Sequence, residues 1–473
     1  MALLSMSVGK LSGERVFLEV EETRTVAEVM RLLEMMFDWS PILALVKDGG
    51  GQLFPKTRLK TLRDEGLLLG GVLHTTVVHG HLEDQCYKHR YGAALRGSNG
   101  LLHVMLDCQW SCQQDEVIQL CANQDTFVAL RADGEVLTLT SDPGDPGTKL
   151  ATGTRSLCST DGAIAALLMD GRVQVWGDAM NGGNLEQVRE QLVNIQQVSS
   201  TRGAFAGLTA DGDVVVWGNR RLGGRVSSHV SKVQQLQAND GAFAALTEQG
   251  TVVCWGSCEH GGACELQLTS VEEIYSSYKA FSARCANGQV WWWGGQLSQS
   301  PLPGPRLEGH LAFRRVVGSN GAFAAVLSDG RVISWGAKEE RQGFEEVQDE
   351  LYDLQDLRAT CGAFCALRHD GHVVCWGSPS VGGARAMGSA PIVGRSLVST
   401  LGAFGVLRVD GGVTFWGHPL AGGSATDVVQ RQLTQVVQLS STEVAFTALR
   451  SDGVLVRWGH PHYTKPRRTL TER

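Results

Sequence analysis

Only one group of side chains in the sequence has the composition of a metal site. Cys254, Cys258, His260 and Cys264 lie close together and carry the sulfur and nitrogen ligands that zinc prefers. Their spacing, C-x3-C-x-H-x3-C, is not one of the strong zinc signatures. Cys254 also occupies a repeated sequence position that Cys375 shares. We therefore interpret Cys254 as a strand residue and expect neither a metal nor a cofactor.

Catalytic constellations are not evident in the sequence. The histidines are not grouped with a serine or cysteine nucleophile, and His369 and His372 flank a turn. There is no Gly-x-x-x-x-Gly-Lys-Ser/Thr loop to hold a phosphate. The aspartates of the repeated Asp-Gly pairs are explained by turn geometry. The sequence therefore predicts a protein that is not an enzyme.

Charge and hydropathy limit the classes of partner. A net charge of −7 over 473 residues offers no general basic surface for phosphate, so we expect no nucleic-acid partner. The sequence has no run of about eighteen apolar residues, so we expect no membrane span. Lys10 and Gly13 interrupt the first residues before a signal-peptide core could form. We expect a cytoplasmic or nuclear protein whose twelve cysteines are mostly reduced.

One phrase organises most of the chain. The stretch GAFAAVLSDGRVISWG, residues 321–336, recurs about every forty residues. Clear copies occupy 162–177, 203–218, 241–256, 279–294, 362–377, 402–417 and 444–459, an eroded copy lies at 125–140 and a fainter one at 91–106. Each copy has an Ala- and Phe-rich half and a Val- and Trp-rich half. Asp-Gly, Asn-Gly or Gln-Gly separates the halves, which predicts a hairpin with a two-residue turn and positive φ at both central positions.

A second pattern lies between the hairpins. Gly-Gly pairs follow most Trp-Gly pairs, and a further strand is expected at 194–200, 232–238, 313–319 and 434–440. Three strands per repeat around an axis predict a β-propeller, in which small alanines let neighbouring sheets approach closely. The recurring tryptophans would fill the space between sheets, each needing a partner for its indole N–H; they are Trp176, Trp217, Trp255, Trp293, Trp335, Trp376, Trp416 and Trp458.

The glycine-started strand, the Asp-Gly turn and the closing Val-x-x-Trp-Gly resemble the repeat of the regulator of chromosome condensation family. The three-stranded, forty-residue form is similar to the β-lactamase inhibitory protein II type of repeat. The resemblance covers about residues 87–460 and implies an all-β propeller, here with nine or ten repeats. Those families build seven-bladed rings, so the number of blades and the way the ring closes stay open.

The first eighty residues lack the repeat. Two strands separated by Ser12-Gly13 precede a capped amphipathic helix over 25–36, and further strands follow. This order resembles the α+β β-grasp fold of ubiquitin. The resemblance implies an apolar docking patch at Leu11, Leu45, His74 and Thr76, although a sheet residue such as Leu45 can equally be structural. Because the segment lacks a terminal Gly-Gly, it is expected to be a recognition module that binds a ubiquitin-pathway receptor.

The triplet Trp291-Trp292-Trp293, near Arg284, is similar to the tryptophan-rich strands of the plant ultraviolet-B photoreceptor. The Gly-Trp-Arg-His-Thr phrase of that photoreceptor is missing here. We therefore expect these tryptophans to pack in the core.

These inferences predict a non-enzymatic scaffold or adaptor that binds a protein on the propeller face. The domains would be 1–80 (ubiquitin-like), 81–124 (linker and degenerate repeat), 125–460 (repeats) and 461–473 (basic tail). The candidate contact segments are 177–193, 218–231, 294–312, 336–350, 377–393 and 417–432. Two alternatives stay open, guanine-nucleotide exchange on a small GTPase and a subunit of a HECT-type ubiquitin ligase.

Overall fold

The computed structural model describes the backbone of the strands before residue 117 and most of residues 117–460. The gaps in the latter range are 124–125, 132, 140–147, 263–267, 296–297, 309–310 and 384–391. The chain divides into two compact units, one of residues 1–89, 96–219 and 229–235, the other of residues 90–95, 220–228 and 236–473. The domain borders expected at residues 80, 124 and 460 stay predictions.

The N-terminal strands form a five-stranded mixed sheet. They are β1 (Leu3–Lys10), β2 (Arg15–Glu21), β3 (Ile42–Lys47), β4 (Leu53–Pro55) and β5 (Leu73–His79), in the order β2-β1-β5-β3-β4. β1 runs parallel to β5 and antiparallel to β2, while β3 runs antiparallel to both β4 and β5. The helix expected over 25–36 lies outside the described residues.

Three-stranded antiparallel units recur through the rest of the chain. The strands up to residue 200 are β6 (Ala93–Arg96), β7 (Leu102–Leu106), β8 (Gln109–Gln114), β9 (Val117–Ala122), β10 (Phe127–Arg131), β11 (Val136–Leu139), β12 (Lys149–Ala151), β13 (Thr154–Ser159), β14 (Ala163–Leu168), β15 (Val173–Gly177) and β16 (Ile195–Ser200). Next come β17 (Ala204–Thr209), β18 (Val214–Gly218), β19 (Val233–Ala238), β20 (Ala242–Thr247), β21 (Val252–Gly256), β22 (Val271–Ser276), β23 (Ala280–Cys285), β24 (Gln289–Gly294) and β25 (Ser298–Arg306). The last are β26 (Phe313–Gly318), β27 (Ala322–Leu327), β28 (Val332–Gly336), β29 (Leu354–Ala359), β30 (Ala363–Arg368), β31 (Val373–Gly377), β32 (Gly394–Ser399), β33 (Ala403–Arg408), β34 (Val413–Gly417), β35 (Val436–Ser441), β36 (Ala445–Arg450) and β37 (Leu455–Gly459).

Each repeat contributes a first, a middle and an outer strand, as in β13-β14-β15 and β35-β36-β37. The predicted three-stranded repeat is therefore confirmed. Two sheets gain a fourth strand, β9-β10-β11-β12 and β22-β23-β24-β25. The radial arrangement of the sheets stays a prediction.

The hairpin turns differ from the expected type. In the turn after β14, Leu168 N donates to Arg172 O (2.8 Å) and Gly171 N donates to Leu168 O (3.0 Å), which encloses three residues instead of two. Gly171 has φ +79°, whereas no aspartate of the Asp-Gly turns is among the positive-φ residues. The prediction of positive φ at both positions was wrong, because the aspartate acts through its side chain: Asp170 Oδ1 accepts from Arg172 N at 3.0 Å.

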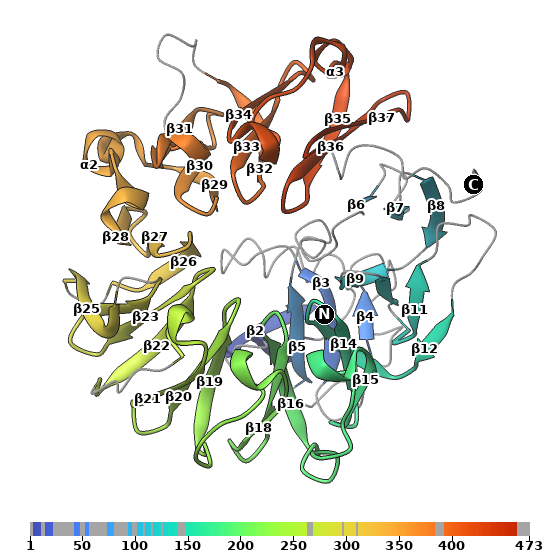
Figure 1. The fold of residues 1–473 in the computed structure, drawn as a ribbon, viewed down its shortest axis with the longest axis vertical. Coiled ribbons are helices and arrows are strands. Elements are labelled where there is room, and N and C mark those ends of the chain that lie inside the picture. The colour runs from blue at the N-terminus through green and yellow to red at the C-terminus, as the bar shows by residue number, and fades with distance from the viewer. Residues whose placement is uncertain are drawn as a thin grey trace. The chain divides into compact units, whose positions relative to one another are not determined.

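Successive sheets pack face to face through apolar seams. In the second unit, Ala322 and Ala324 of β27 lie in one buried cluster with Phe364 and Trp376 of the next sheet. In the same way, Ala403 lies in a cluster with Phe446 and Trp458. Figure 1 shows the sheets β26–β28, β29–β31, β32–β34 and β35–β37 following one another in this unit. Alanine on one side and an aromatic pair on the other therefore make these two seams.

Short helical turns follow the outer strands. They are η2 (Ala179–Asn181), η3 (Arg220–Leu222), η4 (Cys258–His260), η5 (Lys338–Arg341), η7 (Pro379–Val381) and η8 (Pro419–Ala421). Longer loops add α2 (Phe344–Val347), η6 (Gln348–Glu350) and α3 (Asp427–Gln432). Among the described residues, none of the helices has the length and apolar character needed to cross a membrane.

Candidate protein-binding surface

The loops that follow the outer strands are anchored at their glycine pairs. Gly182 has φ +99°, and a Cβ there would lie 2.5 Å from Cδ2 of Phe205 in the next repeat. A Cβ on Gly183 would lie 2.2 Å from Gly177 O. The corresponding glycines Gly223, Gly382 and Gly422 make the same close approach to Phe243, Phe404 and Phe446. Only glycine lets the loop backbone sit this close to the aromatic seam.

The tryptophan of the next repeat completes the anchor. Trp217 stacks on Phe205 with ring centroids 5.3 Å apart, and its Nε1–H donates to Gly182 O at 3.1 Å. The same indole bond joins Trp255 to Gly223 (3.1 Å), Trp416 to Gly382 (3.1 Å) and Trp458 to Gly422 (3.0 Å). In these four repeats the tryptophan therefore fixes the loop of the preceding repeat as well as filling the seam, whereas Trp335 and Trp376 donate to Ser282 and Ser334 on the preceding sheet.

A buried hydroxyl or amide fixes the other end of each turn. Thr400 Oγ1 accepts from Ala403 N and donates to Ala421 O, both at 2.9 Å. Thr160, Thr360 and Asn239 bond in the same way to Asn181, Val381 and His260. We did not identify these residues from the sequence. The available signal was a Ser, Thr or Asn three positions before the alanine that begins each middle strand.

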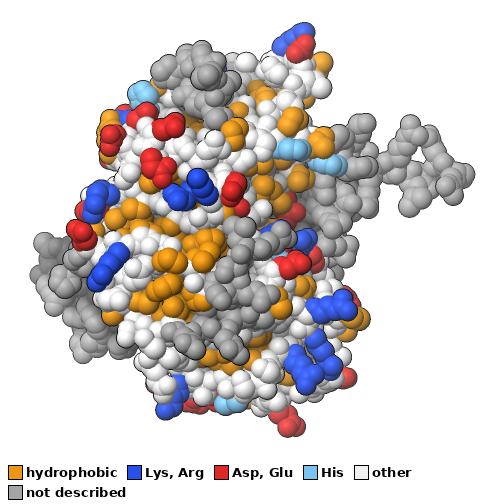
Figure 2. Space-filling model, turned by 60° about the vertical axis from the view of Figure 1, so that its left-hand side comes forward, with side chains coloured by type: hydrophobic (Ala, Val, Ile, Leu, Met, Phe, Trp, Pro, Cys, Tyr) orange, Lys and Arg blue, Asp and Glu red, His pale blue; other side chains and the backbone are white. Residues whose placement is uncertain are grey.

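The exposed side chains on these fixed turns differ in chemistry. Met180 on η2 is 72% exposed and Leu420 on η8 is 52% exposed. Arg220 and Arg221 are exposed on η3, and Lys338 is exposed on η5. Figure 2 shows positive, negative and hydrophobic side chains interspersed on one face of the molecule. These turns therefore present apolar groups in some repeats and cationic groups in others.

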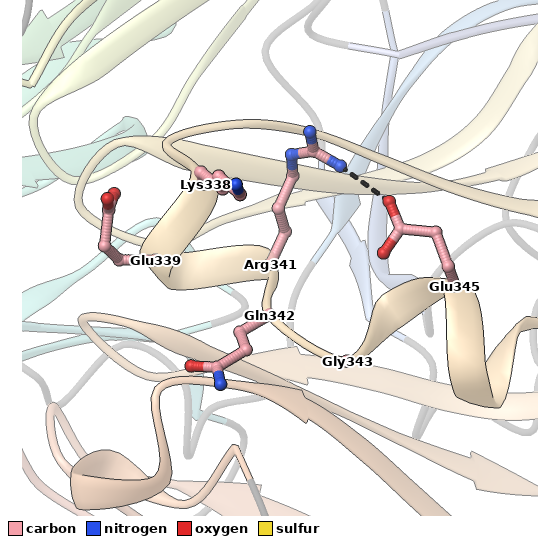
Figure 3. Close-up of a pocket in the computed structure, with 6 residues that line it drawn as sticks. All are labelled: Lys338, Glu339, Arg341, Gln342, Gly343 and Glu345. Atoms are coloured by element: carbon pink, nitrogen blue, oxygen red, sulfur yellow. Dashed lines mark hydrogen bonds and ion pairs between the residues drawn. The ribbon is translucent and has the colours of Figure 1, made fainter.

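A shallow hollow of about 400 Å³ opens in the loop after β28. It is lined by Lys338, Glu339, Arg341, Gln342, Gly343 and Glu345, with an ion pair of 3.0 Å between Arg341 Nη1 and Glu345 Oε1 (Figure 3). The segment that continues from it carries the exposed acids Glu346, Asp349 and Glu350. In this loop a hollow therefore coincides with several acidic side chains.

Glu340 anchors the loop that forms the hollow. Its Oε2 accepts from Ser319 Oγ (2.5 Å) and from Gly321 N (2.8 Å). Burial raises the pKa of Glu340, and these hydrogen bonds only partly offset the effect. Gln342 O also accepts from Gly377 N at 2.8 Å, which ties the loop to β31. In this repeat Ser319 holds the position of the threonine, and the Glu340 carboxylate accepts its bond where other turns offer a backbone carbonyl.

Two clusters of charged side chains involve first strands of repeats in the second unit. Arg284 forms ion pairs with Glu272 (2.6 Å) and Glu273 (3.0 Å). Tyr275 donates a hydrogen bond to Glu273. Burial first, and then the negative charge of Glu273, raise the pKa of Tyr275. The second cluster joins neighbouring sheets, because Asp356 of β29 forms ion pairs with Arg315 of β26 (2.6 Å) and with Arg358 of its own strand (2.9 Å). Burial alone would raise the pKa of Asp356, but the two arginines outweigh it and hold the pKa below its usual range. These charges are satisfied within the fold and stabilise it.

The suggested zinc ligands do not converge in the part that the structure describes. Cys254 lies in β21 opposite Ala244, Cys258 is exposed on η4, and His260 Nδ1 lies 3.0 Å from Ser257 Oγ. Cys264 lies outside the described residues. Within those residues, no three His, Cys, Asp or Glu side chains gather as a metal site.

The tryptophan triplet lies in the seams. Trp293 is fully buried and stacks on Phe281, while Trp292 is 6% exposed in the cluster with Phe323. Trp291 is partly buried against the cluster on the other side. The loop before β26 has no glycine pair of the kind that anchors other loops. Instead, Gly304 on the fourth strand β25 approaches the tryptophan of the next repeat, and a Cβ added there would lie 3.1 Å from Trp335 Cδ1.

The predicted docking patch of the N-terminal sheet is described only as backbone. Leu45 pairs with Val77, and Val46 pairs with Thr76. Leu11 and the side chains of Leu45, His74 and Thr76 lie outside the described residues, so the patch stays a prediction.

No protein-family model matches the sequence, and no curated protein matches it. Among solved structures, Prp20p from Saccharomyces cerevisiae has a TM-score of 0.33 and 16% identity, covering 50% of this chain and 74% of Prp20p; that structure was described with binding properties to Gsp1p and histones. The CRINKLY WD40 ectodomain of the Arabidopsis thaliana receptor kinase ACR4 has a TM-score of 0.33 and 19% identity, covering 54% and 93%. Human WBSCR16 has a TM-score of 0.32 and 15% identity, covering 62% and 87%. At these scores the likenesses carry no argument about what this chain binds.

Proposed function

We propose that the protein is a non-enzymatic scaffold whose repeats form a β-propeller and whose loops after the outer strands bind a protein partner. The observation that carries this proposal is the contrast within those loops. Glycine, tryptophan and buried hydroxyl anchors recur with the same geometry, whereas the exposed groups on the turns differ from repeat to repeat. Variable side chains on a rigid frame are typical of binding surfaces.

The hollow between Lys338 and Glu345 is the proposed centre of contact. Its backbone is fixed by Glu340 and by the bond from Gly377 N to Gln342 O, so little ordering entropy would be lost on binding. Acidic side chains outnumber basic ones around it, which favours a basic segment of the partner.

The test is affinity capture with the full-length chain as bait and a matched pair of charge reversals. Glu339→Lys changes the hollow, and Glu248→Lys makes the same change at an exposed hairpin turn, the other end of the strands. We expect a partner that the wild type and Glu248→Lys recover equally and that Glu339→Lys recovers at least tenfold less. Equal recovery by both variants would place the contact elsewhere.

We further propose that residues 1–80 form a ubiquitin-like domain that links the scaffold to the ubiquitin pathway. The strand order β2-β1-β5-β3-β4, with the first and last strands parallel, supports a β-grasp sheet. In the full-length chain, Thr76→Arg should reduce binding to ubiquitin-receptor domains while the partner of the repeats is still recovered. Unchanged receptor binding, or no receptor binding by the wild type, would remove this link.

A further inference from the structure

Two cysteines oppose each other across a hairpin of the second unit. Cys365 on the middle strand β30 pairs directly with Cys375 on the outer strand β31, and their Sγ atoms lie 2.8 Å apart. The other described sheets have different pairs at this register: Ala165–Val175, Ala206–Val216, Ala244–Cys254, Ser282–Trp292, Ala324–Ser334, Gly405–Phe415 and Thr447–Arg457. Among these, only the sheet β29-β30-β31 places thiol against thiol.

The backbone geometry suits a bond between them. At the hairpin end, Arg368 N donates to His372 O. Hydrogen-bonded and non-hydrogen-bonded pairs alternate along an antiparallel ladder, so Cys365 and Cys375, three positions further along, form a non-hydrogen-bonded pair. The Cα atoms of such a pair approach to about 4.5 Å. Disulfides span Cα separations of about 4.4–6.8 Å, so the two strands need no rearrangement.

Access to the two sulfurs is unequal. Cys365 is fully buried, in a cluster with Phe404 and Val406 of the next sheet. Cys375 is half-buried and packs against the edge of the same cluster. A reagent in solution therefore meets Cys375 first, and Cys365 can react only from within the sheet.

We propose that Cys365 and Cys375 are a modification site that a low-molecular-weight disulfide oxidises to a reversible cross-strand disulfide. The Cys375 thiolate attacks one sulfur of the oxidant, which forms a mixed disulfide and releases one thiol. The Cys365 thiolate then attacks Sγ of Cys375, forms the Cys365–Cys375 bond and releases the second thiol. The two cysteines lose two electrons to the oxidant, and their two protons leave on the released thiols.

The bond would fasten the outer strand of this sheet to its middle strand. β31 carries the fully buried Trp376, and the pair lies in the seam that Trp416 borders. Oxidation would therefore stiffen one repeat without moving the loops that follow the outer strands. This inference does not depend on the proposed function.

The test uses the full-length chain equilibrated with oxidised glutathione, then alkylated, digested with trypsin and analysed by mass spectrometry. Cleavage after Arg368 separates peptide 359–368 from peptide 369–385, and the disulfide would link them. A Cys361→Ser background makes the assignment unique, because Cys361 shares the first peptide. We expect the linked species to form in that background, to revert in reduced glutathione and to be absent from the Cys361→Ser/Cys375→Ser double variant.

Two internal controls accompany this experiment. Cys254 holds the position of Cys375 in the sheet of β20 and β21 but faces Ala244, so no link across that hairpin should form. The exposed Cys258 reports that the oxidant is active, since it should become glutathionylated. If Cys258 reacts while Cys365 and Cys375 are both recovered alkylated, or while Cys375 keeps glutathione and Cys365 is alkylated, the proposal is wrong.

Discussion

The indole N–H of Trp458 donates a 3.0 Å hydrogen bond to the carbonyl oxygen of Gly422, which lies in the loop of the preceding repeat. The bond joins two sheets, since Trp458 belongs to β37 and Gly422 follows β34. Trp458 is 3% exposed, so its polar atom would otherwise be buried without compensation. This contact connects the core of one repeat to the loop that follows the outer strand of the preceding repeat.

Alanine at Gly422 should break this contact, whereas alanine at Gly453 should be tolerated far better. Both glycines have left-handed backbones, with φ +95° and φ +80°, so both substitutions cost about 1–2 kcal/mol of backbone strain. Only at Gly422 would the new Cβ lie 2.5 Å from Phe446 Cδ2; at Gly453 it meets nothing within 4 Å. We expect Gly422→Ala to lower the free energy of unfolding by about 1–3 kcal/mol more than Gly453→Ala. Denaturant unfolding measures the difference, and equal losses would contradict the packing described.

Ser282→Ala should be costly because the buried indole N–H of Trp335 depends on this hydroxyl. Ser282 Oγ accepts from Trp335 Nε1 at 3.0 Å and donates to Trp291 O at 2.8 Å. Leaving a buried group unsatisfied costs about 1–3 kcal/mol. Ser334→Ala is the matched control, because Ser334 Oγ also donates to a backbone oxygen, Phe323 O (2.9 Å), but its bond from Trp376 Nε1 is longer, at 3.4 Å. The thermal midpoint should fall further for Ser282→Ala, and a reversed order would refute the assignment.

Asp356→Asn should destabilise the protein in a pH-dependent way. The pKa of Asp356 is lowered in the folded state, so its contribution is present above its ordinary value of 3.8 and is lost as the pH falls through the lower, folded pKa. At neutral pH the variant should lose about 1.5–3 kcal/mol of unfolding free energy, the scale of hydrogen bonds to charged groups. The difference in unfolding free energy between the wild type and the variant should stay constant down to about pH 5 and disappear in stronger acid. A gap that widens in acid would contradict this.

Glu340→Gln should show the opposite dependence. Burial raises the pKa of Glu340 above its ordinary value of 4.5, so its contribution is full below that value and is lost as the pH rises through the folded pKa. Glutamine can still accept from Gly321 N and carries no charge to desolvate. The variant should therefore be at least as stable as the wild type at neutral pH, with the advantage closing on acidification. Denaturant unfolding curves recorded from neutral to acidic pH measure this difference in stability. A variant that is less stable than the wild type at neutral pH would show that the charge of Glu340 is needed.

The repeat could be predicted from sequence because the same physical demand recurs. A three-stranded sheet cannot cover its own faces, so alanine, phenylalanine and tryptophan return at fixed spacing, and the first strands at 194–200 and 434–440 were expected nearly where β16 and β35 lie. The turn type was missed because Asp-Gly fits both the two-residue and the three-residue hairpin, and the choice depends on the bond from Arg172 N to Asp170 Oδ1.

The candidate surface was harder to predict because it depends on contacts between repeats. Segment 336–350 is a candidate because it lies between two hairpins, but nothing local shows that Glu340 turns inward to Ser319, distant in the sequence. The cysteine pair is a similar case. Cys365 and Cys375 each fit their strands as small apolar residues, and only the register sets them against each other.

The most direct test of the central claim, that the loops after the outer strands bind a partner, is site-specific photo-crosslinking in the full-length chain. A photoreactive residue at Gln342, in the hollow, is compared with one at Gln249, exposed at a hairpin turn. The account predicts a protein adduct from position 342 and none from position 249. Adducts from position 249 alone, or from neither position while the partner is still captured, would contradict it.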